Sequence, residues 1–101
     1  MALTTQLRIY TVNRGQMDLF VNAWREKIVP LRQKYGFKID GGWIYADVNK
    51  FIWMVSYDGP LDWEAANAAY YDSPERTLIQ PEPSDYIAHM ELHLITSVLE
   101  R

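Results

Sequence analysis

The stretch GGWIYADVNKFIWMVSYD, residues 41–58, decides the fold because it predicts a β-hairpin with apolar side chains on both faces. Both arms are rich in β-branched and aromatic residues, and Asp47–Lys50 separates them, so we expect strands over 37–47 and 50–57. Gly41-Gly42 indicates a bulge in the first arm. In the second arm one face carries Phe51, Trp53, Val55 and Tyr57, and the other carries Ile52 and Met54. A strand that is apolar on both faces needs cover on both.

Working outward from the hairpin, periodicity predicts four further elements. We expect a strand at 5–12, a helix at 16–35, a helix at 61–72 followed by a short helix from Ser73-Pro74 to Ile79, and a strand near 86–97. Pro30 is expected to kink the first helix and Gly36 to end it. The order β-α-β-β-α-β predicts an α+β, ferredoxin-like single domain over residues 1–101 with a four-stranded antiparallel sheet. Right-handed crossovers place both helices on one face of that sheet.

The second face of the sheet has no cover from this chain. A large exposed apolar patch usually marks an interface or a ligand groove. We therefore predict a homodimer in which two sheets pack face to face to form an α/β barrel. The sequence does not fix the register of the hairpin, so either Trp43 or Trp53 could point into the space between the sheets.

Near the C-terminus the segment HMELH, residues 89–93, resembles the helical zinc motif H-E-x-x-H. On a strand, however, His89 and His93 lie roughly 13 Å apart at about 3.3 Å per residue, whereas Zn–N bonds are only about 2.0–2.1 Å long. We see no clear third ligand, so we predict no metal site and no cofactor.

Alternation divides the last strand into two sets. Ala88, Met90, Leu92 and Leu94 are assigned to the face under the helices, and His89, Glu91 and His93 to the dimer interior. The first strand is expected to add Gln6, Arg8 and Tyr10 to that interior, with Arg8 and Glu91 as a candidate ion pair. Two interpretations stay open: a polar network that fixes dimer geometry, or a small-molecule pocket.

Residues on the helices also allow more than one role. Tyr70, Tyr71 and Arg76 either line the mouth of a cavity and meet an anionic or aromatic ligand, or combine helix packing with a solvated charge. Lys27, Arg32 and Lys34 are predicted to form a solvated helix face, and Trp24 to lie in the core.

Composition excludes several classes of function. The net charge of −3 argues against a nucleic-acid surface. The absence of cysteine excludes disulfides and cysteine nucleophiles. No apolar run reaches the length of a membrane span, and no signal peptide is evident, so we expect a cytoplasmic protein. Glycine-rich phosphate loops and the G-x-S-x-G serine context are also absent.

Three stretches resemble the NIPSNAP family of the dimeric α/β-barrel superfamily: QLRIYTVNRGQMDLFVNAWREKIVPLRQKYGF at 6–37, the hairpin at 41–58, and AAYYDSPER at 68–76. The resemblance implies a ferredoxin-like homodimer with a central cavity. It implies no catalytic motif, because related barrel families include cofactor-free monooxygenases, haem-degrading enzymes and lactone isomerases.

Three functions follow as hypotheses, and whether the protein is an enzyme stays open. The first is binding of a small apolar or aromatic molecule in a cavity between the sheet and the dimer partner. The second is a cofactor-independent monooxygenase or isomerase acting on a quinol-like or lactone substrate, with His89 or His93 as acid or base and Arg8 stabilising an enolate or phenolate. The third is a structural or protein-interaction module with a filled barrel. The predicted pocket residues are Arg8, Tyr10, Trp43, Trp53, Tyr71, His89, Glu91 and His93.

Overall fold

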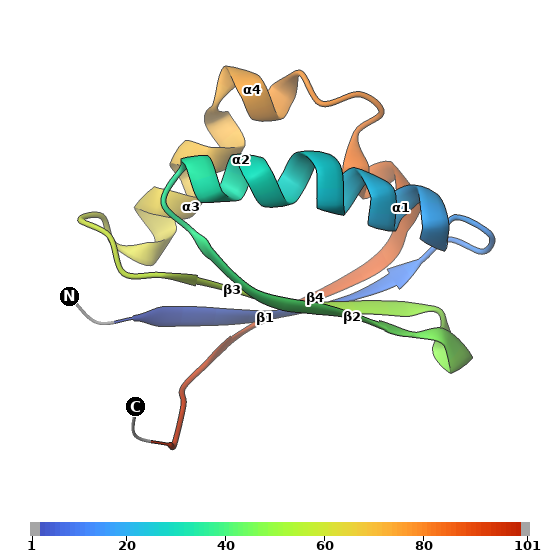
Figure 1. The fold of residues 1–101 in the computed structure, drawn as a ribbon, viewed down its shortest axis with the longest axis horizontal. Coiled ribbons are helices and arrows are strands. Elements are labelled where there is room, and N and C mark those ends of the chain that lie inside the picture. The colour runs from blue at the N-terminus through green and yellow to red at the C-terminus, as the bar shows by residue number, and fades with distance from the viewer. Residues whose placement is uncertain (1–2, 100–101) are drawn as a thin grey trace.

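A computed structural model describes residues 3–99 and shows a four-stranded sheet with all its α-helices on one face (Figure 1). The elements in chain order are β1 (Thr4–Val12), α1 (Met17–Ala23), a π-helical turn (Trp24–Ile28), α2 (Val29–Lys34), β2 (Lys38–Tyr45), a 3₁₀ turn (Ala46–Val48), β3 (Lys50–Tyr57), α3 (Trp63–Asp72), α4 (Pro74–Thr77), a second 3₁₀ turn (Pro83–Tyr86) and β4 (Ile87–Ile95). The strand order is β2-β3-β1-β4 and every neighbouring pair is antiparallel. The predicted ferredoxin-like order is thus confirmed. None of the helices in residues 3–99 is long and apolar enough to cross a bilayer.

Local signals set most of the element boundaries. Gly36 follows Tyr35, the C-cap of α2, and adopts φ 91°, as expected of a glycine that ends a helix. The Asp62 side chain caps α3, and the Ser73 hydroxyl caps α4 by accepting from the backbone N–H of Arg76 at 3.1 Å. The predicted extension of α4 to residue 79 is too long, because the helix ends at Thr77. The bulge predicted at Gly41-Gly42 is present as a register shift between Ile39 and Gly41.

The first helix contains a π-helical turn immediately before Pro30. The Val29 N–H donates to the Trp24 carbonyl, five residues back. Pro30 has no N–H to continue the α-helical pattern, which makes a local departure from it favourable. One extra residue in the turn rotates the rest of the helix by roughly 100°. That rotation places Arg32 under the helix, so the prediction that Arg32 is solvated is wrong.

The face of β1 that carries Gln6, Arg8 and Tyr10 packs under the helices. Arg8 lies directly opposite Trp53 in β3 and Leu92 in β4, and directly opposed residues share a face. Gln6 and Tyr10 are likewise paired with the buried residues Val55 and Phe51. The assignment of these three polar residues to the dimer interior is therefore wrong. Arginine and tyrosine can pack long apolar stems in a core while their polar tips hydrogen-bond.

The other face of the sheet, here called the open face, is covered by no helix of residues 3–99 (Figure 1). The strand pairings place on it Leu7 and Ile9 of β1, Trp43 of β2, Ile52 and Met54 of β3, and His89, Glu91 and His93 of β4. The structure thus decides between the two tryptophans. Trp53 is buried under the helices, and Trp43 lies on the open face with half of its surface exposed. Met90, Leu92 and Leu94 face the helix side as predicted, but Leu92 and Leu94 lie largely exposed. The register shifts at Ala88, so Ile87 rather than Ala88 pairs with Val12 and packs on the helix side.

Candidate functional site

A cavity of about 430 Å³ lies between the sheet and its own helices. Its lining residues include Arg8, Tyr10 and Trp53 from the sheet, Arg32 from α2, Tyr70 and Tyr71 from α3, Arg76 from α4, and Glu82 and Pro83 from the segment before β4. We call this space the arginine cavity. Its volume is within the range of sites that hold small molecules, about 300–1,000 Å³.

Arg8 is a buried cation with no carboxylate among its hydrogen-bond partners in residues 3–99. Its Nε donates to Gln6 at 2.7 Å, and its Nη1 donates to the hydroxyls of Tyr10 and Tyr71 at 2.9 Å each. Only 1% of the residue is exposed. Burial on its own lowers the pKa of Arg8, but Tyr10 and Tyr71 raise it further than burial lowers it. The hydrogen bonds therefore hold Arg8 charged and in place.

Arg32 is as deeply buried as Arg8, but it has fewer hydrogen-bond partners. Its Nη1 donates to Asn67 at 2.9 Å, while its Nε has no hydrogen-bond partner among residues 3–99. The guanidinium stacks on aromatic rings, 3.9 Å from the centre of Tyr70 and 4.6 Å from that of Phe37. Burial lowers the pKa of Arg32, and the neighbouring charge of Arg8 acts in the same direction. Arg32 is thus a desolvated cation with a free donor.

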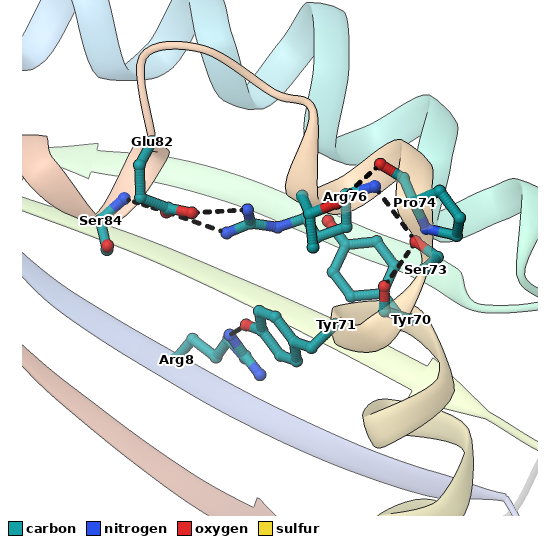
Figure 2. A network of polar contacts seen from close by, with 9 residues as sticks. Arg8, Tyr70, Tyr71, Ser73, Pro74, Arg76, Glu82 and Ser84 are labelled. Carbon is teal, nitrogen blue, oxygen red and sulfur yellow. Dashed lines mark hydrogen bonds and ion pairs between the residues drawn. The ribbon is translucent and has the colours of Figure 1, made fainter.

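Arg76 forms a bidentate ion pair with Glu82 at the rim of the arginine cavity (Figure 2). The two N–H···O distances are 2.8 and 3.1 Å, a geometry that is strong and directional. Glu82 also accepts from the backbone N–H of Ser84 at 2.8 Å. The ion pair therefore connects Glu82, in the segment before β4, to α4.

The charges of the arginine cavity do not balance. Three arginines and one glutamate line it, which leaves two positive charges, on Arg8 and Arg32. Neither of those two forms an ion pair within the described part of the chain. A buried cation without a counter-ion costs several kcal/mol. An anionic group entering the cavity would remove that cost.

The Arg76–Glu82 pair predicts a pH dependence of stability. The hydrogen bond from Arg76 lowers the pKa of Glu82 from 4.5 to about 2. A carboxyl whose pKa is lower in the folded state stabilises the fold above pH 4.5 and loses that contribution as the pH falls towards 2. We expect Glu82→Gln to melt at a lower temperature than wild type at neutral pH. This difference in melting temperature should disappear as the pH falls from 4.5 to 2. Thermal melts of both proteins across pH measure it.

Glu26→Gln serves as the control for this experiment, because it removes one exposed carboxylate from the same helical side of the molecule. A gap between wild type and Glu82→Gln that stayed constant from neutral pH down to pH 2 would contradict the assigned ion pair.

The predicted site residues separate into two groups. Arg8, Tyr10, Trp53 and Tyr71 line the arginine cavity. Trp43, His89, Glu91 and His93 belong to the open face and do not line it. The expected Arg8–Glu91 pair is wrong, because Glu91 is opposite Ile9 rather than Arg8. Glu91 instead lies 3.3 Å from His93 Nε2 and 4.0 Å from Lys50. Within residues 3–99 no three His, Cys, Asp or Glu side chains are grouped as a metal site would require.

Sequence reasoning missed Arg32 and left Arg76 undecided. Arg32 lies four residues after Ile28 on a helix whose face shifts at Pro30, and a proline within a helix was the available signal. Arg76 lies three residues after Ser73, whose capping hydroxyl fixes the start of α4. Both guanidiniums reach the cavity because these local backbone features direct them there.

The fold and the cavity together define a ferredoxin-like α+β domain with a basic, aromatic pocket under its helices. The NIPSNAP family profile matches residues 5–98, so the chain belongs to the NIPSNAP family. A comparison with curated proteins finds no match.

Solved structures with the same fold include several NIPSNAP proteins. An uncharacterised NIPSNAP domain protein from Burkholderia xenovorans is 17% identical, with a TM-score of 0.80 over 95% of this chain and 94% of that one. A NIPSNAP family protein from Agrobacterium tumefaciens is 16% identical, with a TM-score of 0.81 over 94% and 92%. A protein from Nitrosomonas europaea, designated a candidate antibiotic biosynthesis monooxygenase, is 13% identical, with a TM-score of 0.71 over 95% and 90%. At these identities the likeness shows the fold alone.

Proposed function

We propose that this NIPSNAP protein binds a small, flat anion in the arginine cavity. The observation that carries the proposal is the pair of buried guanidiniums, Arg8 and Arg32, without a carboxylate partner in the described chain. The first hypothesis from the sequence placed a ligand between the sheet and a dimer partner. The cavity under the helices is the better candidate because it combines these two charges with apolar walls.

The walls of the cavity support an aromatic or conjugated ligand. The Arg8 and Arg32 guanidinium carbons lie 5.4 and 6.0 Å from the centre of the Trp53 ring. Tyr71 provides a second ring on the opposite element, α3. Rings that already flank cations favour a flat partner, whose face can stack while its charged edge accepts hydrogen bonds.

Matched pairs of aromatic acids and their uncharged amides test the proposal. We expect an acid that fits to raise the melting temperature, because ligand at 100 times its Kd stabilises a protein by about 2.7 kcal/mol. For a domain of this size that corresponds to roughly 10–20 °C. The isosteric amide should produce no comparable shift, because it offers no negative charge to Arg8 and Arg32. A thermal-shift panel of benzoates and benzamides without phenolic hydroxyls, followed by calorimetry, measures the difference.

His93→Ala is the control, since His93 lies on the open face, outside the cavity lining. It should bind the same acids as wild type. Equal responses to acids and amides, or a loss of binding in His93→Ala with retention in Arg8→Met, would contradict the proposal.

A second candidate function is cofactor-independent oxidation or isomerisation of the bound molecule. It is favoured by the position of Arg8, whose guanidinium points into the cavity where it could stabilise an enolate or phenolate. The fold shared with the designated monooxygenase from Nitrosomonas europaea is compatible with that chemistry. Incubating a binding acid with the protein in air and analysing its mass separates turnover from binding alone.

The open face supports a proposed homodimer. Leu7, Ile9, Ile52 and Met54 form an apolar centre on it, and Trp43 extends that centre across β2. Apolar patches that no other element covers usually mark interfaces. A second copy packing its own open face there would cover both centres at once, in a two-fold arrangement. If the barrel so formed were the only functional feature, the protein would be a structural module, and the acid panel would give no response.

A further inference from the structure

Tyr71 has an unusual environment among the side chains of the arginine cavity. Its hydroxyl accepts a hydrogen bond from Arg8 Nη1 at 2.9 Å. Its ring centre lies 6.0, 5.2 and 5.3 Å from the guanidinium carbons of Arg8, Arg32 and Arg76. Figure 2 shows the Tyr71 ring between the side chains of Arg8, from β1, and Arg76, from α4. One phenol therefore faces three cations that come from three different elements.

Within residues 3–99, no carboxylate is available to balance Arg8 and Arg32. Glu82, the one carboxylate of the cavity lining, is already paired with Arg76 in bidentate fashion. The remaining groups that could carry a negative charge are the phenols of Tyr10, Tyr70 and Tyr71.

These three phenols differ in their access to solvent. Tyr10 and Tyr70 are almost fully buried, whereas 38% of Tyr71 is exposed. An anion is costly to form where water is excluded and less costly where water still reaches it. Tyr71 combines the strongest positive surroundings with the best access, so it is the phenol that can lose a proton and exchange it.

We propose that Tyr71 is the proton acceptor of the arginine cavity, and that the ligand enters as a phenol or enol which gives its proton to Tyr71. This inference rests on the proposed anion site and names its ligand class. The step starts from the tyrosinate form of Tyr71: the ligand O–H bond breaks and a Tyr71 O–H bond forms. The charge moves from the tyrosinate oxygen to the ligand oxygen, and no atom is oxidised or reduced. The ligand anion then accepts hydrogen bonds from Arg8 and Arg32.

The chemistry of the acceptor selects this ligand class. A carboxylic acid is already ionised at neutral pH and needs no base to bind as an anion. A phenol or enol is largely protonated there, and only a site that removes its proton can hold it as an anion next to two guanidiniums. Matching the proton affinities of Tyr71 and of the ligand makes the transfer reversible.

The balance of charges around Tyr71 acts in the required direction. Burial raises the pKa of Tyr71, but the charges of Arg8 and Arg32 lower it more, and its net pKa lies below the ordinary value of 10.0. Burial raises the pKa of Tyr10 and of Tyr70, and the nearby arginines only partly offset that effect. The pKa values of the three cavity tyrosines therefore diverge: those of Tyr10 and Tyr70 are raised and that of Tyr71 is lowered.

Absorbance titration of the unliganded protein tests the inference without any knowledge of the ligand. We expect the tyrosinate band to grow first by the amplitude of one of the seven tyrosines, with a midpoint below pH 10.0. Tyr71→Phe, which removes only the hydroxyl of a partly exposed side chain, should lose that phase. Tyr10→Phe should retain it. Arg8→Met should move its midpoint to higher pH, while Arg25→Met, which removes an exposed charge, should leave it unchanged.

Two results would overturn the inference: a first phase that survives in Tyr71→Phe, or the absence of any one-tyrosine phase below pH 10.0. The acid and amide panel keeps this failure distinct from failure of the anion site. Anion binding without an early phase would leave the site in place and remove Tyr71 as acceptor. If the one-tyrosine phase appeared but no ligand changed its midpoint, the lowered pKa of Tyr71 would be supported and the anion site would be contradicted.

Discussion

Arg32→Met is expected to weaken anion binding by roughly 10- to 100-fold and to leave the empty protein at least as stable as wild type. The loss of affinity corresponds to about 1.5–3 kcal/mol for hydrogen bonds to a charged group. The stability is expected to hold because methionine fills similar space without a desolvated charge, a replacement that often stabilises by about 1–4 kcal/mol. Lost cation–π contacts with Tyr70 and Phe37 offset part of that gain, by about 0.5–2 kcal/mol.

Arg8→Met is the matched control for this result. The same substitution at Arg8 removes three hydrogen bonds and leaves Gln6, Tyr10 and Tyr71 without their donor. We expect it to lower stability by about 1–3 kcal/mol. Urea unfolding of both variants measures the contrast. If Arg32→Met lowered the free energy of unfolding by more than about 2 kcal/mol, the loss would exceed the contribution of its cation–π contacts. Arg32 would then be a structural residue rather than a ligand-binding one.

Ile52→Asp is expected to convert the proposed dimer into a folded monomer. Ile52 lies at the centre of the open face, directly opposite Ile9 on one side and Trp43 on the other. Two-fold symmetry would bury two carboxylates for each substitution, and an unpaired buried charge costs several kcal/mol. Within a monomer the same position keeps partial contact with solvent, so the fold should tolerate the change.

Native mass spectrometry at micromolar concentration, with circular dichroism as a check on folding, measures the outcome. Leu78→Asp is the matched control because it introduces the same charge at an exposed leucine near the end of α4, on the helix side. We expect it to leave the dimer intact. A wild-type monomer, or a dimer that survives Ile52→Asp, would contradict the open-face interface.

Much of the fold could be predicted from the sequence because its signals are local. The β-branched and aromatic residues of 50–57, the Ser73-Pro74 cap and the glycine at 36 each act within a few residues. The face of β1 could not be predicted in the same way. Alternation along β1 places Arg8 on one face of the sheet and Leu7 and Ile9 on the other. Because Arg8 is charged, its face was predicted to be the one away from the helices. The structure reverses this, because a guanidinium among aromatic rings and phenol hydroxyls is stable in the core.

The candidate site was only partly predictable for the same reason. Tyr10, Trp53 and Tyr71 were selected as pocket residues, and they do line one cavity. The histidines were selected for their chemistry, yet strand pairing places them on the open face. Arg32 could not be recognised without knowing that the helix changes phase before Pro30. Such a change depends on tertiary packing as well as on the local sequence.

The central claim, a small anion held by Arg8 and Arg32 under the helices, is tested most directly by the side-chain N–H signals of those two arginines. A nitrogen–proton correlation spectrum, recorded while an aromatic acid selected by the thermal panel is added, follows each Nε–H separately. We predict that the Arg32 Nε–H signal shifts strongly with the acid and not with its amide, because that atom has no partner in the described chain. If the selected acid instead left both arginine signals unchanged and shifted those of the open face around His89 and His93, the ligand site would lie on the other side of the sheet.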